Sequence, residues 1–555
     1  MLFRSNNRGV VRRTAPCFNV RTHMNKKNTA AAIVLLGLLL YGLLGLHRLD
    51  RPGLQYDECL FVPPLLDAPS RFAMAQLGDG GPVLMHMPYL GGLKSILMKP
   101  WLIRAGVTPV TLRAPMVLIG LAALLLTAWL AALAFGRREA ALAAMLFALD
   151  PSALHHVRED WGPCALALLL RTGVLVCVVA FAKKQNARWL LAGAALAGLG
   201  LWNKADFAFF LFALMIAATL WHRPALRTVP GKTWGQALAL FLLAALPAWT
   251  FWLTHGELLR WSLGAAPHPF GWLTLKYKIY ALFDTLRGFY PIHNFLGEGS
   301  ITTKRTLLPH LLLAGLIALP PLRRKIRETP AWTGRMLPFF ITLLGVQTIL
   351  LLLVPQVGGS HHYFSLVPTT HVLAAALVWL FIDHAFTTAR ARRIGTVLIL
   401  LPLLLTSAIA VGDVELTLDR RGGAGNWSPA IDQLAAQVAA EPTARYQFLD
   451  WGMTTQLVAL NGKFDYEEIF WSLALAPATS EAMEQLSTAM LDARNVFVAH
   501  DVAHTIFDQV PWRVAEKMAE LKLVVENEAV IDGTDGKPLY RLFKFTPLVV
   551  EDLAQ

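Results

Sequence analysis

The chain has 555 residues, of which 55% are hydrophobic and only 16% are charged, and its mean hydropathy is +0.48. A soluble globular protein carries about 25% charged residues, so this composition excludes an ordinary soluble protein and indicates a polytopic membrane protein. The formal charge of +13 does not indicate a nucleic-acid partner. Its Lys and Arg residues form short clusters between apolar runs, as the orientation rule for membrane proteins requires.

The first predicted span covers residues 29–46 and follows a basic segment, residues 1–28. Because basic segments stay on the cytoplasmic side, the chain after this span should emerge on the outer face. It carries two adjacent carboxylates there, Asp57 and Glu58. Ionisable groups at a membrane boundary are costly to desolvate and persist mainly where they line a wet cavity or do chemistry. A solvated pair of loop carboxylates is an equally good reading of this spacing alone.

Later apolar runs predict further spans, among them residues 112–135, 140–154 and 397–411, and each inward crossing ends at a basic cluster. Residues 81–106 are also long enough to span, but they carry His86, Lys94, Lys99 and Arg104. If this segment crossed, every later basic cluster would lie outside. We therefore expect it to lie along the outer interface or dip into it, which leaves about eleven spans.

With this orientation, the polar clusters gather on the outer face. They are Asp57-Glu58, Lys94, Lys99, Arg158-Glu159-Asp160, Lys204-Ala205-Asp206, residues 254–305 and the segment that contains His361-His362. A transporter would place ionisable residues in mid-membrane, so charges at one rim favour an enzyme that works at one leaflet. A multi-pass transporter or flippase of a lipid-linked substrate, and a non-catalytic envelope assembly protein, remain the alternatives.

From Gly412 the composition becomes that of a soluble domain. Buried strands are predicted at residues 446–449 and 495–499, and amphipathic helices at 431–440 and 480–491. The sequence thus divides into a basic N-terminus (1–28), a transmembrane region (29–411) and an outer α/β domain (412–555). Acceptor capture, partner docking and a structural role are open for this last domain. Cys59 and Cys164 both fall near the outer face, so a disulfide between them is an alternative to free thiols.

The order of these motifs resembles that of the polyprenyl-phosphate-sugar-dependent glycosyltransferases of glycosyltransferase family 39, which include protein O-mannosyltransferases and lipid A aminoarabinose transferases. Arg113-Ala114-Pro115 is similar to their Arg-Leu-Pro element, and Gly136-Arg137-Arg138 to the basic turn after it. Arg158–Pro163 looks like their second acidic motif, and Lys204 stands where they carry a lysine. Met98-Lys99-Pro100 departs from their pattern, and the tail matches nothing in the group. The resemblance covers roughly residues 30–410 and implies a GT-C fold, all-α in the membrane.

The resemblance implies transfer of a sugar from a polyprenyl phosphate to an acceptor hydroxyl, with inversion of the anomeric centre. Asp57 would be the general base, with Glu58 and Asp160 as further catalytic residues. The cations Lys94, Lys99, Arg158 and Lys204, with His361 and His362, would meet the phosphate. A divalent cation on Asp57 and Asp160 is left open, although adjacent histidines make a two-His metal site unfavourable. The acceptor would be a glycan, a lipid or a protein, in a bacterial inner membrane with the outer domain in the periplasm.

Overall fold

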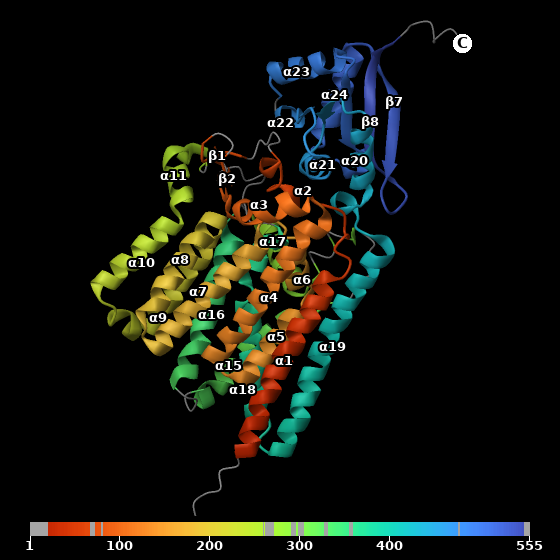
Figure 1. Ribbon diagram of the computed structural model, residues 1–555. Coiled ribbons are helices and arrows are strands. Elements are labelled where there is room, and N and C mark those ends of the chain that lie inside the picture. Colours follow the sequence, from red (N-terminus) through yellow and green to blue (C-terminus); the bar gives the residue numbers. More distant parts are fainter. Residues whose placement is uncertain are drawn as a thin grey trace, which may run out of the picture.

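The protein forms a bundle of long helices, and an α/β domain lies at one end of this bundle (Figure 1). The computed structural model describes residues 20–66, 73–78, 81–258, 260, 271–289, 293, 296–297, 305–326, 331–354, 359–474 and 478–548. Most of the basic N-terminus, residues 1–19, lies outside the described residues.

Six described helices are long and apolar enough to cross a membrane, and three bent helix pairs raise this number to nine. The six are α1 (Val20–Leu46), α4 (Pro109–Ala134), α7 (Cys164–Lys184), α9 (Phe207–Arg227), α16 (Ala331–Leu353) and α19 (Ala389–Arg421). The bent pairs are α5 (Arg137–Ala148) with α6 (Pro151–Arg158), α10 (Gly231–Ala244) with α11 (Leu246–Thr254), and α17 (Ser360–Tyr363) with α18 (Thr369–Ala385).

Two further helices occupy the remaining places where the sequence predicts a span. Helix α8 (Ala187–Asn203) has 17 residues, and α15 (Leu308–Ile326) contains the apolar stretch Leu308–Ala318. A shorter helix, α13 (Trp272–Leu286), follows the α10–α11 pair. The all-α membrane architecture predicted from the sequence is confirmed.

The bundle packs closely where small residues let helices approach. Gly120 of α4 faces Tyr41 of α1, and a Cβ at this position would lie 2.3 Å from the Tyr41 hydroxyl oxygen. A larger side chain at this position would therefore require Tyr41 or one of the two helices to shift. Helices α5 and α7 are buried over most of their length, so the bundle core forms around them.

The charged segment 81–106 does not run through the bundle. It forms the strands β2 (Val83–Met87) and β3 (Leu90–Gly91) and then helix α3 (Leu93–Ala105). Strand β2 lies in the middle of a three-stranded sheet, between β3 and β1 (Ala75–Gln76). Helix α3 lies at the end of the bundle, beside the α/β domain (Figure 1). It therefore carries Lys94 to the same end as the short helix α2 (Tyr56–Cys59).

The C-terminal α/β fold is also confirmed. Helix α19 continues from the bundle to Arg421, ten residues past the predicted end of the last span, and the domain follows it. Its mixed sheet has the order β5-β4-β6-β8-β7, in which β4 (Arg445–Phe448) runs parallel to β5 (Tyr466–Glu467) and β6 (Asn495–His500). Strands β7 (Leu523–Asp532) and β8 (Pro538–Pro547) form an antiparallel hairpin. The helices are α20 (Ala430–Ala440), α21 (Thr454–Asn461), α22 (Phe470–Leu473), α23 (Ser480–Leu491) and α24 (Gln509–Glu520).

Candidate active site

The two adjacent carboxylates lie on α2, and they face different surroundings. The Gln55 side chain accepts a hydrogen bond from the Asp57 backbone N–H at 2.6 Å, and Glu58 accepts one from the Gln55 N–H at 3.5 Å. This reciprocal cap defines the first turn of a helix that would otherwise be too short to hold its own geometry. It fixes the backbone from which Asp57 extends.

Asp57 lies in a cavity of about 1020 Å³ between the bundle and the C-terminal domain. Burial raises the pKa of the Asp57 carboxyl, whereas the nearby Lys204, a hydrogen bond from the Trp161 indole and the more distant charge of Lys94 lower it in part. Desolvation is the dominant of these effects, so the carboxyl binds a proton more tightly than an exposed aspartate does. A carboxylate with a raised pKa is a stronger base, which suits the removal of a proton from a hydroxyl.

Asp160 and Lys94 form a buried ion pair behind this cavity. The Lys94 Nζ lies 2.6 Å from Asp160 Oδ2, and both side chains are at most 5% exposed. The other Asp160 oxygen, Oδ1, accepts the Ala165 N–H of helix α7 at 2.8 Å. Asp160 therefore joins α3 to the start of α7 and holds an ammonium group in place.

A second ion pair joins Lys204 and Asp206, in the turn between α8 and α9. The Lys204 Nζ lies 3.3 Å from Asp206 Oδ2, and His362 Nδ1 lies 3.2 Å from the same oxygen. Burial alone would raise the pKa of Asp206, but the charge of Lys204 and the hydrogen bond from His362 lower it below its usual range. Asp206 thus stays ionised and positions both a lysine and a histidine.

His361 lines the cavity next to Asp57 and Trp161. Its ring lies 5.7 Å from the Trp161 ring and 4.1 Å from the His362 ring, measured between centroids. Two residues of the site were not predicted from the sequence: Trp161, which lines the cavity, and Asp206, which binds Lys204 and His362. Both stand beside residues that were, in Asp160-Trp161 and Lys204-Ala205-Asp206, so proximity in sequence was the available signal.

Three of the predicted site residues lie elsewhere. The Glu58 carboxylate binds Arg113 of α4 at 2.6 and 2.8 Å, and both side chains are buried. Arg158 is buried against Glu159 at 2.8 Å and Glu415 of α19 at 3.0 Å. Lys99 stands five residues after Lys94 on α3, about 140° around the helix, so it does not face the same side. The structure therefore gives Glu58 and Arg158 buried structural partners instead of access to the cavity.

The opposite wall of the cavity comes from the C-terminal domain. Trp451 and His504 follow the carboxyl ends of the parallel strands β4 and β6, and Asp535 and Lys537 belong to the turn between β7 and β8. The end of α19 adds Arg421. Thr534 of the β7–β8 turn donates a hydrogen bond to the Gly423 carbonyl at 2.8 Å, which ties this turn to the loop after α19. The cavity thus has the Asp57 carboxylate on one wall and a mixed aromatic and charged surface on the other.

Within the described residues, no group of three or more His, Cys, Asp or Glu side chains is placed to hold a metal ion. Asp160 uses its two oxygens for Lys94 and the Ala165 N–H, and Asp57 accepts the Trp161 indole N–H. Cys59 and Cys164 are both buried free thiols, so the disulfide considered from the sequence is not formed.

The comparisons with known proteins agree with this fold. Residues 96–252 match the sequence profile of the dolichyl-phosphate-mannose-protein mannosyltransferase family. A search of curated protein sequences found no match. Among solved structures, the chain is similar to ArnT from Cupriavidus metallidurans in the apo state, with a TM-score of 0.52 and 13% identity over 93% of this chain and 98% of that chain.

The structure of the same protein bound to undecaprenyl phosphate gives a TM-score of 0.51 and 14% identity, with 93% of this chain and 98% of that chain covered. The Archaeoglobus fulgidus oligosaccharyltransferase tethered to an acceptor peptide gives a TM-score of 0.51 and 14% identity, with 95% of this chain and 75% of that chain covered. The fold and the family match define the class: the protein is an integral-membrane glycosyltransferase of the GT-C fold. Its resemblance to enzymes that use lipid-phosphate sugars is thereby confirmed.

Proposed function

We propose that the protein transfers a sugar from a polyprenyl-phosphate donor to an acceptor hydroxyl, with inversion at the anomeric carbon and Asp57 as the general base. The observation that carries this proposal is the position of Asp57, which faces a cavity of about 1020 Å³ at the end of the bundle where Lys94, Lys204 and His361 also lie. Asp57 removes the acceptor's proton as the acceptor oxygen bonds to the anomeric carbon, and the bond from that carbon to the phosphate oxygen breaks.

The leaving group is a lipid phosphate that gains negative charge as this bond breaks. Lys94 and Lys204 are each held in place by a carboxylate, Asp160 and Asp206. Cations positioned before the reaction stabilise developing charge without the cost of reorganising solvent. We assign Lys204, with His361 and His362 beside it, to binding of the phosphate. The charge of Lys94 acts at longer range on both Asp57 and the phosphate.

Two neighbours of similar fold support the ligand classes in this proposal. One carries undecaprenyl phosphate, and the other carries an acceptor peptide. The wall formed by the C-terminal domain would receive the acceptor, whether it is a glycan, a lipid or a protein. Because the basic loops lie at the opposite end of the bundle, we place the site in the periplasm of a bacterial inner membrane, with the N-terminus in the cytoplasm.

The test is transfer of radiolabel from polyprenyl-phosphate-linked sugars in membranes that contain the protein. The Asp57→Asn variant should lose at least about 100-fold in rate, because it removes the base with little change in shape. Asp50→Asn is the matched control, since Asp50 lies seven residues away with its side chain 57% exposed and bound to Arg48. Full transfer by the Asp57→Asn variant would exclude Asp57 as the base, and no transfer from any donor by the folded wild type would exclude the proposed reaction.

A further inference from the structure

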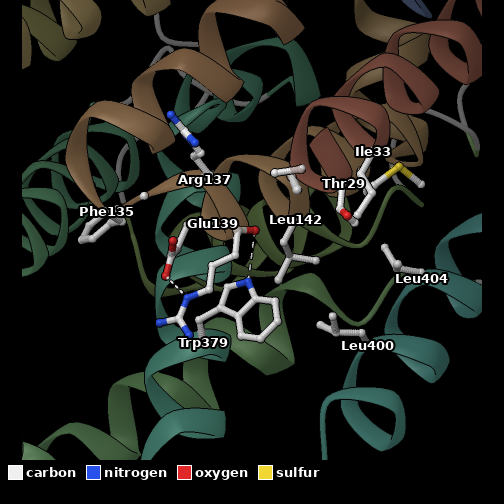
Figure 2. Close-up of a pocket in the computed structure, with 14 residues that line it drawn as sticks. Thr29, Ile33, Phe135, Arg137, Glu139, Leu142, Trp379, Leu400 and Leu404 are labelled. Atoms are coloured by element: carbon white, nitrogen blue, oxygen red, sulfur yellow. Dashed lines mark hydrogen bonds and ion pairs between the residues drawn. The ribbon is translucent and has the colours of Figure 1, made fainter. Parts of the chain in front are cut away.

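A second cavity, of about 700 Å³, lies at the opposite end of the bundle from Asp57. Helices α1, α5 and α19 form its apolar walls with Ile33, Leu142, Leu400 and Leu404, and Figure 2 shows these side chains. Trp379 of α18 lies on another side of it. The candidate active site uses none of these residues.

The cavity opens toward the lipid-facing side of the bundle. Helices α1 and α19 are only 17% and 28% buried over their apolar windows, so most of their surface would face lipid. Both helices pack against α5, which forms the floor between them. A hollow with apolar walls and a side opening of this kind accommodates acyl chains.

The mouth of the cavity is cationic. Arg138 is held by Glu139 at 2.8 Å, by Asp383 and by the face of Trp379, whose ring centroid lies 5.0 Å away. Arg137 is exposed and has no carboxylate within ion-pair distance in the described part of the chain. One arginine is therefore neutralised and fixed, and the other keeps its charge.

The helix directions add to this positive field. Helix α5 begins at Arg137, so the positive end of its dipole is at the mouth of the cavity, where the first-turn carboxylate of Glu139 is already paired with Arg138. Helix α19 begins at the same end, has no acidic residue in its first turn and carries three arginines in its first turns, Arg390, Arg392 and Arg393. Arg392 lies 3.7 Å from the Asp383 carboxylate that also binds Arg138. Arginines near helix N-termini oppose the helix dipole, and a bound anion relieves that repulsion.

We propose that this cavity binds an anionic phospholipid of the leaflet at the basic end of the bundle. Its acyl chains would fill the space between α1, α5 and α19, and its phosphate would lie at the N-terminus of α5 against Arg137. Charge complementarity selects the occupant, because a zwitterionic lipid brings an ammonium group to an already cationic mouth. This inference does not depend on the proposed reaction.

Native mass spectrometry of the full-length protein tests it, with phosphatidylglycerol and phosphatidylcholine of identical acyl chains as probes. The wild type should retain phosphatidylglycerol preferentially, and Arg137→Gln should weaken that retention about fivefold. Arg188→Gln is the matched control, since Arg188 is an exposed arginine at the start of α8 that does not line the cavity. A second pair tests the apolar part: Ala30→Trp fills the cavity, whereas Ala31→Trp adds the same group at an exposed neighbour outside it.

Loss of bound phosphatidylglycerol in Arg137→Gln and Ala30→Trp, but not in Arg188→Gln or Ala31→Trp, would support the site. Equal retention of the two lipids by the wild type would overturn it. Equal loss in a variant and its control would show a general surface-charge or surface-area effect, which also overturns it.

Discussion

The carboxylate of Glu58 and the guanidinium of Arg113 form a buried two-point ion pair, 2.6 and 2.8 Å long, between helix α2 and helix α4. Arg113 also donates to the carbonyl oxygens of Leu49 and Pro52, at 2.9 and 2.7 Å. One arginine thus binds the chain between α1 and α2 at several points. The direction in which Asp57 extends depends on this arrangement.

Glu58→Gln should destabilise the protein, because Arg113 would keep its charge in a buried site without a counter-charge. Breaking a buried pair from one side costs about 3–5 kcal/mol, which should lower the thermal unfolding temperature. The control is Glu441→Gln, since the Glu441 side chain is 61% exposed. The double change Glu58→Met with Arg113→Met should recover part of the loss. A Glu58→Gln variant that is as stable as the wild type but inactive would instead show that Glu58 takes part in catalysis.

The pH dependence of transfer should report the Asp57 carboxyl. Because burial raises its pKa, the acidic limb of kcat/KM should lie above the usual aspartate value of about 3.9. Activity falls as the pH drops through that limb, since the protonated carboxyl cannot act as a base. Trp161→Phe removes a hydrogen bond that favours the charged form, so it should move the limb to higher pH while changing the neutral-pH rate less.

Trp451→Phe is the control for this shift, because Trp451 also lines the cavity but packs on Tyr56, with ring centroids 4.5 Å apart. If both tryptophan variants move the limb equally, the shift reflects cavity polarity and not the hydrogen bond to Asp57.

The two lysines of α3 should behave differently. Lys94→Met should lower kcat about tenfold, because its charge acts on Asp57 and the phosphate from a distance, whereas Lys99→Met should leave kcat unchanged. Single-turnover transfer rates measure this contrast, and thermal unfolding of each variant shows whether Lys94→Met stays folded with Asp160 unpaired. Equal effects at the two positions would contradict a specific role for Lys94.

Lys537 should influence the acceptor and not the donor. It lies in the β7–β8 turn that forms part of the far wall of the cavity. Lys537→Ala should therefore raise the KM for the acceptor severalfold and leave the KM for the lipid-phosphate donor unchanged. Lys544→Ala is the control, because Lys544 lies on β8, the strand that follows this turn, and contacts Glu441 instead of the cavity. A change in the donor KM alone would contradict this division of the cavity.

The sequence predicted the membrane architecture well because apolar runs and basic loops are local signals. Strands β4 and β6 and helix α23 also appear where alternation and periodicity indicated them. Helix α19 runs ten residues past the predicted end of the last span, because hydropathy records where a helix leaves an apolar environment and not where its hydrogen bonds end.

The site was harder to predict because the partner of a charge can be far away in sequence. Arg158 looked available for phosphate, but Glu415 lies 257 residues further along the chain and binds it at 3.0 Å. Glu58 was predicted to act together with Asp57, but its carboxylate is paired with Arg113. The contribution of Trp451 and Lys537 depends on how the C-terminal domain sits on the bundle, which no local pattern encodes.

Arg158 also has a mechanical consequence. Its guanidinium binds the carbonyl oxygens of Leu44 and His47 at 3.3 and 3.2 Å, and also Glu415. It therefore fastens the end of α1, helix α6 and helix α19 to one another. Helix ends fastened in this way should move as a single rigid body. We therefore expect the β7–β8 turn across the cavity to make room for an entering acceptor, once its hydrogen bond from Thr534 to the Gly423 carbonyl opens.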